Sequence, residues 1–240
     1  MNSLGGRVAV ITGASRGIGA ATVRELAAAG ARVAAGARAI GELSALAAEL
    51  GTAVAPLALD VRDEASVVEF ARSVDERLGP PDIVIANAGV GSFHELHEFP
   101  VREFDEIFAV NVRGTFLTLR AFLPGLRQRG RGHVVVTSDV ATRSIARGGP
   151  YAASKHAQRA MIQALAREVN PLGIRVSEIR PGLVDTHFGG RTPGSERLSG
   201  RVALRAGDVA RAIVYALAQP EAVRVDEVLF HPSGHEPDWG

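Results

Sequence analysis

Length, composition and charge set the first limits on this chain of 240 residues and 25.2 kDa. It is long enough for one sizeable core and short for two independent domains. Its formal net charge is +1 and its arginines are interspersed with acidic residues, which excludes an extended basic surface for nucleic acid or membranes. The absence of cysteine excludes disulfides, thiolate metal sites and a cysteine nucleophile. We expect one domain over 1–240.

The beginning of the chain, MNSLGGRVAVITG, has no charged segment followed by a long apolar stretch. No part of the chain approaches the roughly 18 consecutive apolar residues of a membrane-spanning helix. The seven histidines are scattered and none belongs to an HExxH pattern, so we expect no metal site. These features predict a cytoplasmic protein with neither a nucleic-acid nor a membrane partner.

Short apolar runs rich in β-branched residues alternate with longer helical patterns, as in a βαβ series with a parallel sheet. The near-continuous apolarity of the runs indicates strands covered on both faces. The predicted strands span 7–12, 31–37, 53–59, 82–87, 133–138, 174–180 and 226–231. The predicted helices span 17–29, 39–50, 63–78, 101–128, 151–169 and 208–219. The sequence therefore predicts an α/β fold with a single doubly wound (Rossmann) parallel sheet of about seven strands and helices on both faces.

Two features of this pattern are more specific. Asp208 precedes the last predicted helix as an N-cap, and Pro220 follows its end. The segment 187–201 is rich in Gly, Ser and Arg and breaks the alternation, so we predict a flap beside the substrate.

The stretch TGASRGIG (12–19) joins the first predicted strand to the first predicted helix. Gly13 allows a tight turn, while Gly17 and Gly19 let the backbone and a helix N-terminus approach a pyrophosphate. The turn lacks the Lys-Ser/Thr pair of a P-loop, which disfavours a nucleotide triphosphatase. A glycine turn with a purely structural role is the alternative, and the flanking strand and helix favour dinucleotide binding.

The end of the second strand distinguishes the two nicotinamide cofactors. An NAD-binding protein places an acid there to bind the adenosine ribose, whereas this chain has Ala37 and Arg38. Arg38, together with Arg16 in the glycine turn, offers planar cations to a ribose 2′-phosphate. Both are ordinary surface arginines in the alternative interpretation. The missing acid favours NADP(H).

Tyr151 and Lys155 lie four residues apart, so a helix projects both from one face. Lys155 is the sole lysine beside twenty-six arginines, and Tyr151 is one of two tyrosines. A neighbouring ammonium favours the phenolate and lowers a phenol's pKa from about 10, which makes the tyrosine a usable acid and base. The first turn of an ordinary alanine-rich helix is the alternative interpretation of YAASK.

Several motifs together resemble the short-chain dehydrogenase/reductase family over essentially the whole chain. In the family's order they are TGASRGIG, Asp60 in LDV, NAG at 87–89, Asn111 in NVRG, Ser138, YAASK and PGLVDT at 181–186. The chain departs from the pattern at Ala86, where Asn is frequent, and at Thr137-Ser138-Asp139, where a Ser-Ser pair is frequent.

The resemblance implies hydride transfer centred on Tyr151, which would protonate the substrate carbonyl while Ser138 hydrogen-bonds it. Lys155 would hold the nicotinamide ribose and tune the phenol, and Asn111 would support a water in the proton relay. The catalytic set is then Asn111, Ser138, Tyr151 and Lys155. The predicted cofactor-binding set is Gly13, Ser15, Arg16, Gly17, Ile18, Gly19, Arg38, Asp60, Val61, Asn87, Ala88, Gly89, Tyr151, Lys155, Pro181, Gly182, Val184 and Thr186.

The expected function is that of an NADP-dependent carbonyl reductase or alcohol dehydrogenase acting on CH–OH groups of a small molecule. The family resemblance also implies a homodimer or homotetramer that pairs its two longest helices and its last strand. Arg143, Arg191, Arg197 and Arg201 suggest an acidic substrate, such as a 3-hydroxy acid or a carrier-bound 3-oxoacyl group. The alternatives are a cofactor-sensing regulatory protein without turnover and a cofactor-assisted isomerase or dehydratase.

Overall fold

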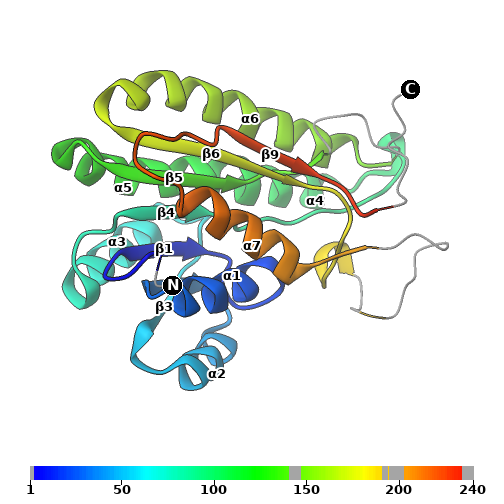
Figure 1. Ribbon diagram of the computed structural model, residues 1–240. Helices are drawn as coiled ribbons and strands as arrows, with labels where there is room; N and C mark the ends of the chain where they lie inside the picture. Colours follow the sequence, from blue (N-terminus) through cyan, green and yellow to red (C-terminus); the bar gives the residue numbers. More distant parts are fainter. Residues whose placement is uncertain (1–2, 141–146, 191–193, 195–202, 234–240) are drawn as a thin grey trace.

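The sheet of this protein has seven parallel strands in the order β3-β2-β1-β4-β5-β6-β9 (Figure 1). The structure, a computed structural model, describes residues 3–140, 147–190, 194 and 203–233. The strands of this sheet are β1 Val8–Thr12, β2 Arg32–Ala37, β3 Val54–Ala58, β4 Ile83–Ala86, β5 Gly132–Thr137, β6 Ile174–Pro181 and β9 Glu227–Phe230. Two short strands, β7 Val184–Asp185 and β8 Leu204–Arg205, pair beside it. The predicted fold class is confirmed.

Helices cover both faces of the sheet. They are α1 Gly17–Ala28, α2 Ile40–Leu50, α3 Glu64–Leu78, α4 Val101–Ile107, α5 Thr115–Arg129, α6 Gly149–Val169 and α7 Ala206–Leu217. One apolar core joins the sheet to α1, α2 and α7, and a second joins it to α3, α5 and α6. Figure 1 shows α1 and α7 side by side on the first face.

Burial on both faces explains the apolar runs. All five residues of β1 and all four of β4 are buried, and each fully buried Val or Ile side chain contributes about 1.5–3 kcal/mol. The strand order reverses between β1 and β4. Ligands of doubly wound folds bind outside the carboxyl ends of the strands at such a switch point.

The prediction of one continuous helix over 101–128 is wrong. The chain forms α4, then a π-helical segment Phe108–Gly114, and then α5. Thr115 Oγ1 donates to the Asn111 carbonyl at 2.7 Å and Thr118 Oγ1 to the Gly114 carbonyl at 2.8 Å. The widened turns place Asn111 against the loop after β4, and such π-bulges are frequent at functional sites.

The predicted N-cap of the last helix is also wrong. α7 begins at Ala206 with Arg205 as its N-cap, and Asp208 lies in the first turn. The Asp208 carboxylate accepts a hydrogen bond from the Arg205 backbone N–H at 2.7 Å. This is the N3 position of a capping box, where an acid satisfies an N–H that the helix leaves without a partner.

Of the predicted flap 187–201, the structure describes 187–190 and 194, with a short 3-10 turn at Phe188–Gly190. The remainder of the flap lies outside the described residues. Strand β9 is at the edge of the sheet, and the pairing of copies through it stays a prediction. Among the described residues, no helix has the length and apolarity to cross a membrane, and no group of three or more His, Cys, Asp or Glu is placed to hold a metal ion.

Candidate active site

The turn after β1 has room for glycine alone at two positions. A Cβ on Gly19 would lie 2.0 Å from the Gly13 carbonyl oxygen, and one on Gly13 would lie 2.8 Å from the Ala88 Cα. Gly13 also has a φ of +67°, which side chains disfavour. The turn therefore brings bare backbone and the N-terminus of α1 to the carboxyl edge of the sheet, as a pyrophosphate requires.

Thr12 ties this turn to the end of β4. Its hydroxyl oxygen accepts hydrogen bonds from the backbone N–H groups of Asn87 and Ala88, both at 3.1 Å. The Asn87 side-chain amide donates to the carbonyls of Thr12 at 3.0 Å and Gly13 at 3.3 Å. The predicted segment 87–89 thus lies directly against the glycine turn. Thr12 was not in the predicted set, although a polar residue at the end of a buried strand must find partners.

The segment 181–186 reaches the same turn from the other side. A Cβ on Gly17 would lie 3.3 Å from Thr186 Cγ2, and the Gly182 N–H is held by the Phe230 carbonyl at 2.8 Å. Ile18 and Val184 pack against one core. The structure therefore brings these predicted cofactor residues together, with Pro181 at the end of β6 and Ser15 half-buried in the turn.

At the end of β2, Arg38 is more than half exposed, and its guanidinium is 3.8 Å from Glu106. Arg62 forms ion pairs with Asp60 at 2.6 Å and with Glu106 at 2.7 Å. Its guanidinium holds the pKa of Asp60 below its ordinary value, mainly through the side-chain hydrogen bonds. Arg62 is a further cation beside Arg38 that sequence reasoning missed, although it follows LDV directly. Arg16 is exposed at the start of α1.

Tyr151 and Lys155 lie on one face of α6, and both are buried, each with 3% exposure. Lys155 Nζ lies 5.7 Å from the centroid of the phenol ring and donates to the Thr137 carbonyl at 3.4 Å. Burial lowers the pKa of Lys155 to about 8, and the carboxylates of Asp139 and Glu178 oppose that shift. The ammonium is therefore dry and close to its titration range.

Asn111 joins this helix to the loop after β4. Its amide oxygen accepts from the Val90 N–H, and its NH₂ donates to the Val90 carbonyl and to Ser154 Oγ, each at 2.9 Å. A Cβ on Gly89 would lie 3.5 Å from Asn111 Oδ1 and 3.7 Å from Lys155 Nζ. Three predicted site residues, from the loop after β4, from α6 and from the π-helical segment, therefore meet here.

The two residues after β5 have different partners. Ser138 donates its hydroxyl proton to Glu178 Oε1 at 2.6 Å, in the interior. The Tyr151 hydroxyl donates to Asp139 Oδ2 at 2.8 Å. Asp139 was not among the predicted site residues, and the signal that marks it is the departure from the Ser-Ser pair. The role predicted for Ser138 at the substrate oxygen stays a prediction.

Aromatic rings surround the phenol. The ring centroid of Tyr151 is 5.8 Å from that of Phe93 and 5.3 Å from that of Phe188. A Cβ on Gly91 would lie 2.6 Å from the Phe188 ring. These rings give the tyrosine an apolar surrounding. The arginines suggested for an acidic substrate, Arg143, Arg191, Arg197 and Arg201, lie outside the described residues.

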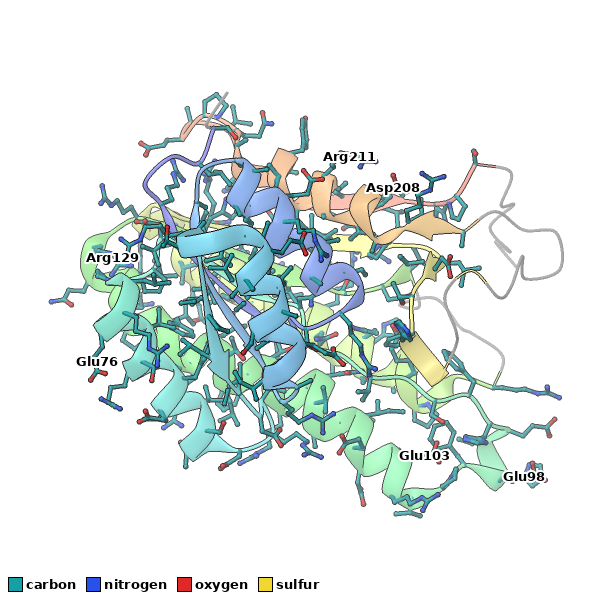
Figure 2. The ribbon with its side chains drawn as sticks, turned by 90° about the horizontal axis from the view of Figure 1, so that it is seen from below. Glu76, Glu98, Glu103, Arg129, Asp208 and Arg211 are labelled. Atoms are coloured by element: carbon teal, nitrogen blue, oxygen red, sulfur yellow. The ribbon has the colours of Figure 1, made fainter. Side chains whose placement is uncertain are left out.

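The site lies at one end of the molecule. Figure 2 shows Glu98 and Glu103 at that end, and Glu76 and Arg129, near the ends of α3 and α5, at the opposite end. Glu103, in α4, accepts a hydrogen bond from Ser92 and is 3.0 Å from His94. Acidic side chains thus flank the loop that carries Phe93.

Comparison with known proteins shows the protein family to which this chain belongs. A family model described as short chain dehydrogenase matches residues 7–195. The chain belongs to this family of oxidoreductases, and its Rossmann-type sheet is the family's fold.

Two relatives match nearly the whole of this chain. Over 239 residues the chain is 40% identical to glycine betaine reductase ATRR of Emericella nidulans, covering 95% of this chain and 19% of that protein. It is 34% identical to an uncharacterised oxidoreductase of Staphylococcus epidermidis, covering 94% and 97% of the two chains.

Two solved structures are similar over nearly all of both chains. An alcohol dehydrogenase from the archaeon Thermococcus sibiricus, complexed with 5-hydroxy-NADP, has a TM-score of 0.91 and 42% identity over 97% of this chain and 99% of its own. A serine dehydrogenase complexed with NADP+ has a TM-score of 0.92 and 28% identity over 96% and 97% of the two chains. Other similar structures contain NADH or NAD.

Proposed function

We propose that the protein is an NADP(H)-dependent oxidoreductase that interconverts a carbonyl compound and a secondary alcohol, with Tyr151 as its acid and base. The observation that carries the proposal is the buried Tyr151–Lys155 pair beside the glycine turn. Burying a tyrosine hydroxyl and an ammonium on the same helix face costs hydration free energy. A helix with a purely structural role would gain nothing from that cost.

The residues present fit a dinucleotide. The glycine turn and the first N–H groups of α1 would hold the pyrophosphate. Asn87 and Gly89 would line the ribose side, and Lys155 would donate to the nicotinamide ribose hydroxyls. When bound, the nicotinamide supplies or accepts the hydride.

The remaining chemistry belongs to the chain. Tyr151 gives its hydroxyl proton to the oxygen of a carbonyl, or takes it back from an alcohol. The Lys155 ammonium favours the phenolate left behind, and it acts strongly because the site is dry. Phe93 and Phe188 exclude water from the phenol.

Several features support NADP(H) over NAD(H). β2 ends in Ala37 without an acid, and Arg38 follows it with an exposed guanidinium. Arg62 adds a second cation near the same position. The similar alcohol and serine dehydrogenase structures contain 5-hydroxy-NADP and NADP+.

The test is an absorbance screen of NADPH and NADH against ketones, 3-oxo acids and thioesters, with Tyr151→Phe in parallel. We expect the substitution to lower kcat by about 10²–10⁴-fold because the transferable proton is lost. Tyr215→Phe is the matched control, since that side chain is 59% exposed on α7. Equal activity of Tyr151→Phe and wild type would refute the mechanism.

The same screen separates the alternatives. A regulatory protein would bind NADPH tightly and oxidise none with any member of the panel. A cofactor-assisted isomerase or dehydratase would convert substrate without net change in NADPH absorbance.

A further inference from the structure

Ser138 and Asp139 follow β5 directly, and their side chains point to different parts of the molecule. Consecutive side chains in extended backbone project to opposite faces, so one of the two faces inward when the other faces the phenol. Ser138 is buried and Glu178, its partner, is also buried. Arg159 holds the second Glu178 oxygen at 3.0 Å.

This arrangement uses up the serine's donor. A hydroxyl carries one proton, and Ser138 gives it to a carboxylate at 2.6 Å. Charge-assisted hydrogen bonds of this kind are short and strong. A serine held in this way has no proton to donate to a substrate oxygen.

The Asp139 side chain contacts the active-site phenol, whereas the Ser138 side chain contacts Glu178 in the interior. Asp139 Oδ2 accepts the Tyr151 hydroxyl proton at 2.8 Å. Among the described residues, the charged groups near it include the Lys155 ammonium of α6, whose pKa the Asp139 carboxylate raises, and the Arg180 guanidinium of β6, whose Nε donates to the Asp139 backbone carbonyl at 3.5 Å. The carboxylate therefore contacts the atom whose proton must move.

We propose that Asp139, in place of Ser138, is the side chain that faces the substrate oxygen together with Tyr151. This inference rests on the proposed function. Because the carboxylate contacts the reacting phenol, Asp139 is a catalytic residue in this scheme.

The carboxylate gives the site a chemical preference that a serine would not. An ionised carboxylate only accepts hydrogen bonds, and a carbonyl oxygen also only accepts, whereas an alcohol hydroxyl donates. Ionised Asp139 therefore suits an alcohol, and protonated Asp139 suits a carbonyl compound.

The atoms balance in the oxidative direction. The alcohol's C–H bond breaks and its hydride goes to the oxidised nicotinamide. Its O–H proton goes to the Tyr151 phenolate oxygen, which leaves a ketone. Asp139 exchanges no atom. It accepts the alcohol's hydrogen bond as the substrate binds, the alcohol proton then turns to the Tyr151 phenolate oxygen and is transferred to it, and afterwards Asp139 accepts the hydrogen bond of the Tyr151 hydroxyl.

The first experiment needs no substrate. In a Tyr215→Phe background, tyrosinate absorbance reports Tyr151 alone, because the chain has two tyrosines. We expect Asp139→Asn to raise the acid-dissociation constant of the phenol about tenfold, because a neighbouring negative charge opposes phenolate formation. Ser138→Ala is the matched control and should leave the titration unchanged. A titration that responds to Ser138→Ala and not to Asp139→Asn would overturn the proposal.

The second experiment measures kcat/KM against pH for the best ketone of the screen and for its alcohol. Asp139→Ala should lower kcat/KM about 100-fold, and Ser138→Ala less than about threefold. Asp139→Ser and Asp139→Asn should lose an ionisation that wild type and Ser138→Ala both show. Circular dichroism identifies any variant that fails to fold, and Asp139→Asn, which keeps the shape, then decides.

These outcomes separate the inference from the proposed function. If wild type consumes no NADPH with any panel member, the proposed function fails, and the tyrosinate titration still decides the role of Asp139. If wild type is active, inactive Ser138→Ala with unchanged Asp139 variants refutes the inference alone.

Discussion

The glycine turn and the segment after β5 both lie at the carboxyl edge of the sheet, but different forces fix them. In the turn, main-chain atoms approach so closely that Gly19 has no room for a Cβ. Directly after β5 there is no glycine, and the site depends on which way the side chains of Ser138 and Asp139 point. A motif of glycines therefore specifies its own geometry, whereas a motif of polar side chains depends on their neighbours.

The largest expected effect concerns the catalytic side. Lys155→Arg should lower kcat by about 10²–10⁴-fold, because a planar guanidinium that does not titrate would replace a compact ammonium in a buried site. Steady-state kinetics measures it, with circular dichroism to verify folding. Arg167→Lys, an exposed change in the last turn of the same helix, should leave kcat unaltered. A Lys155→Arg enzyme with more than about a tenth of wild-type kcat would contradict the role given to Lys155.

A side chain at Gly19 should disrupt the backbone of the glycine turn. Gly19→Ala places a methyl group 2.0 Å from the Gly13 carbonyl oxygen, which we expect to cost about 1–3 kcal/mol of folding free energy. Thermal unfolding with and without NADPH should show a lower Tm and no stabilisation by the cofactor. Gly41→Ala in α2 is the control, since a Cβ there meets nothing within 4 Å, and it should be neutral or stabilising. Retained NADPH stabilisation in Gly19→Ala would count against the pyrophosphate site.

Cofactor choice should respond to one charge at the end of β2. Arg38→Asp should shift the NADPH/NADH preference at least about tenfold towards NADH, because a charge-assisted hydrogen bond to the 2′-phosphate is lost and an acceptor for ribose is gained. The ratio of kcat/KM values measures it. Arg32→Asp, at the opposite end of the same strand, should leave the ratio unchanged. A wild type that prefers NADH would contradict the interpretation of Arg38.

The smallest expected effect is a pH dependence of cofactor affinity. Lys155 has a pKa of about 8, so its ammonium is present below this value and is lost as the pH rises through it. NADPH should bind about fourfold more weakly at about pH 8.5 than at about pH 7. Titration of protein fluorescence with NADPH measures the affinity. Lys155→Met should bind weakly without this dependence, and an equal dependence in both proteins would assign it to another group.

Lys155 also makes the free energy of unfolding depend on pH. Its folded pKa of about 8 lies below the ordinary 10.5, so between these values the unfolded chain holds more protons. The free energy of unfolding therefore gains a contribution as the pH rises through that window, because the buried charge is neutralised.

Much of the fold was predictable because buried parallel strands are continuous apolar runs. Both ends of each predicted strand lie within two residues of the ends of the observed strand. The break in the predicted helix 101–128 was not predictable from the local pattern, since the π-helical segment carries Asn111, whose side chain is bonded to Val90 in the loop after β4. The prediction of Asp208 as N-cap was wrong for a related reason. An aspartate is typical of the start of a helix, but whether it takes the N-cap or a position in the first turn depends on the residue at which the helix begins.

The sequence by itself determined the doubly wound sheet, the glycine turn and the Tyr151–Lys155 spacing, since hydrophobic period, missing side chains and helical geometry are local properties. Tertiary structure decided which polar groups meet. Thr12 at the end of β1 is bonded to Asn87 after the neighbouring β4, Arg62 joins Arg38 through Glu106, and Asp139 contacts the phenol while Ser138 is bonded to Glu178. Side-chain direction after a strand is set by buried partners far along the chain, such as Glu178, which no local pattern specifies.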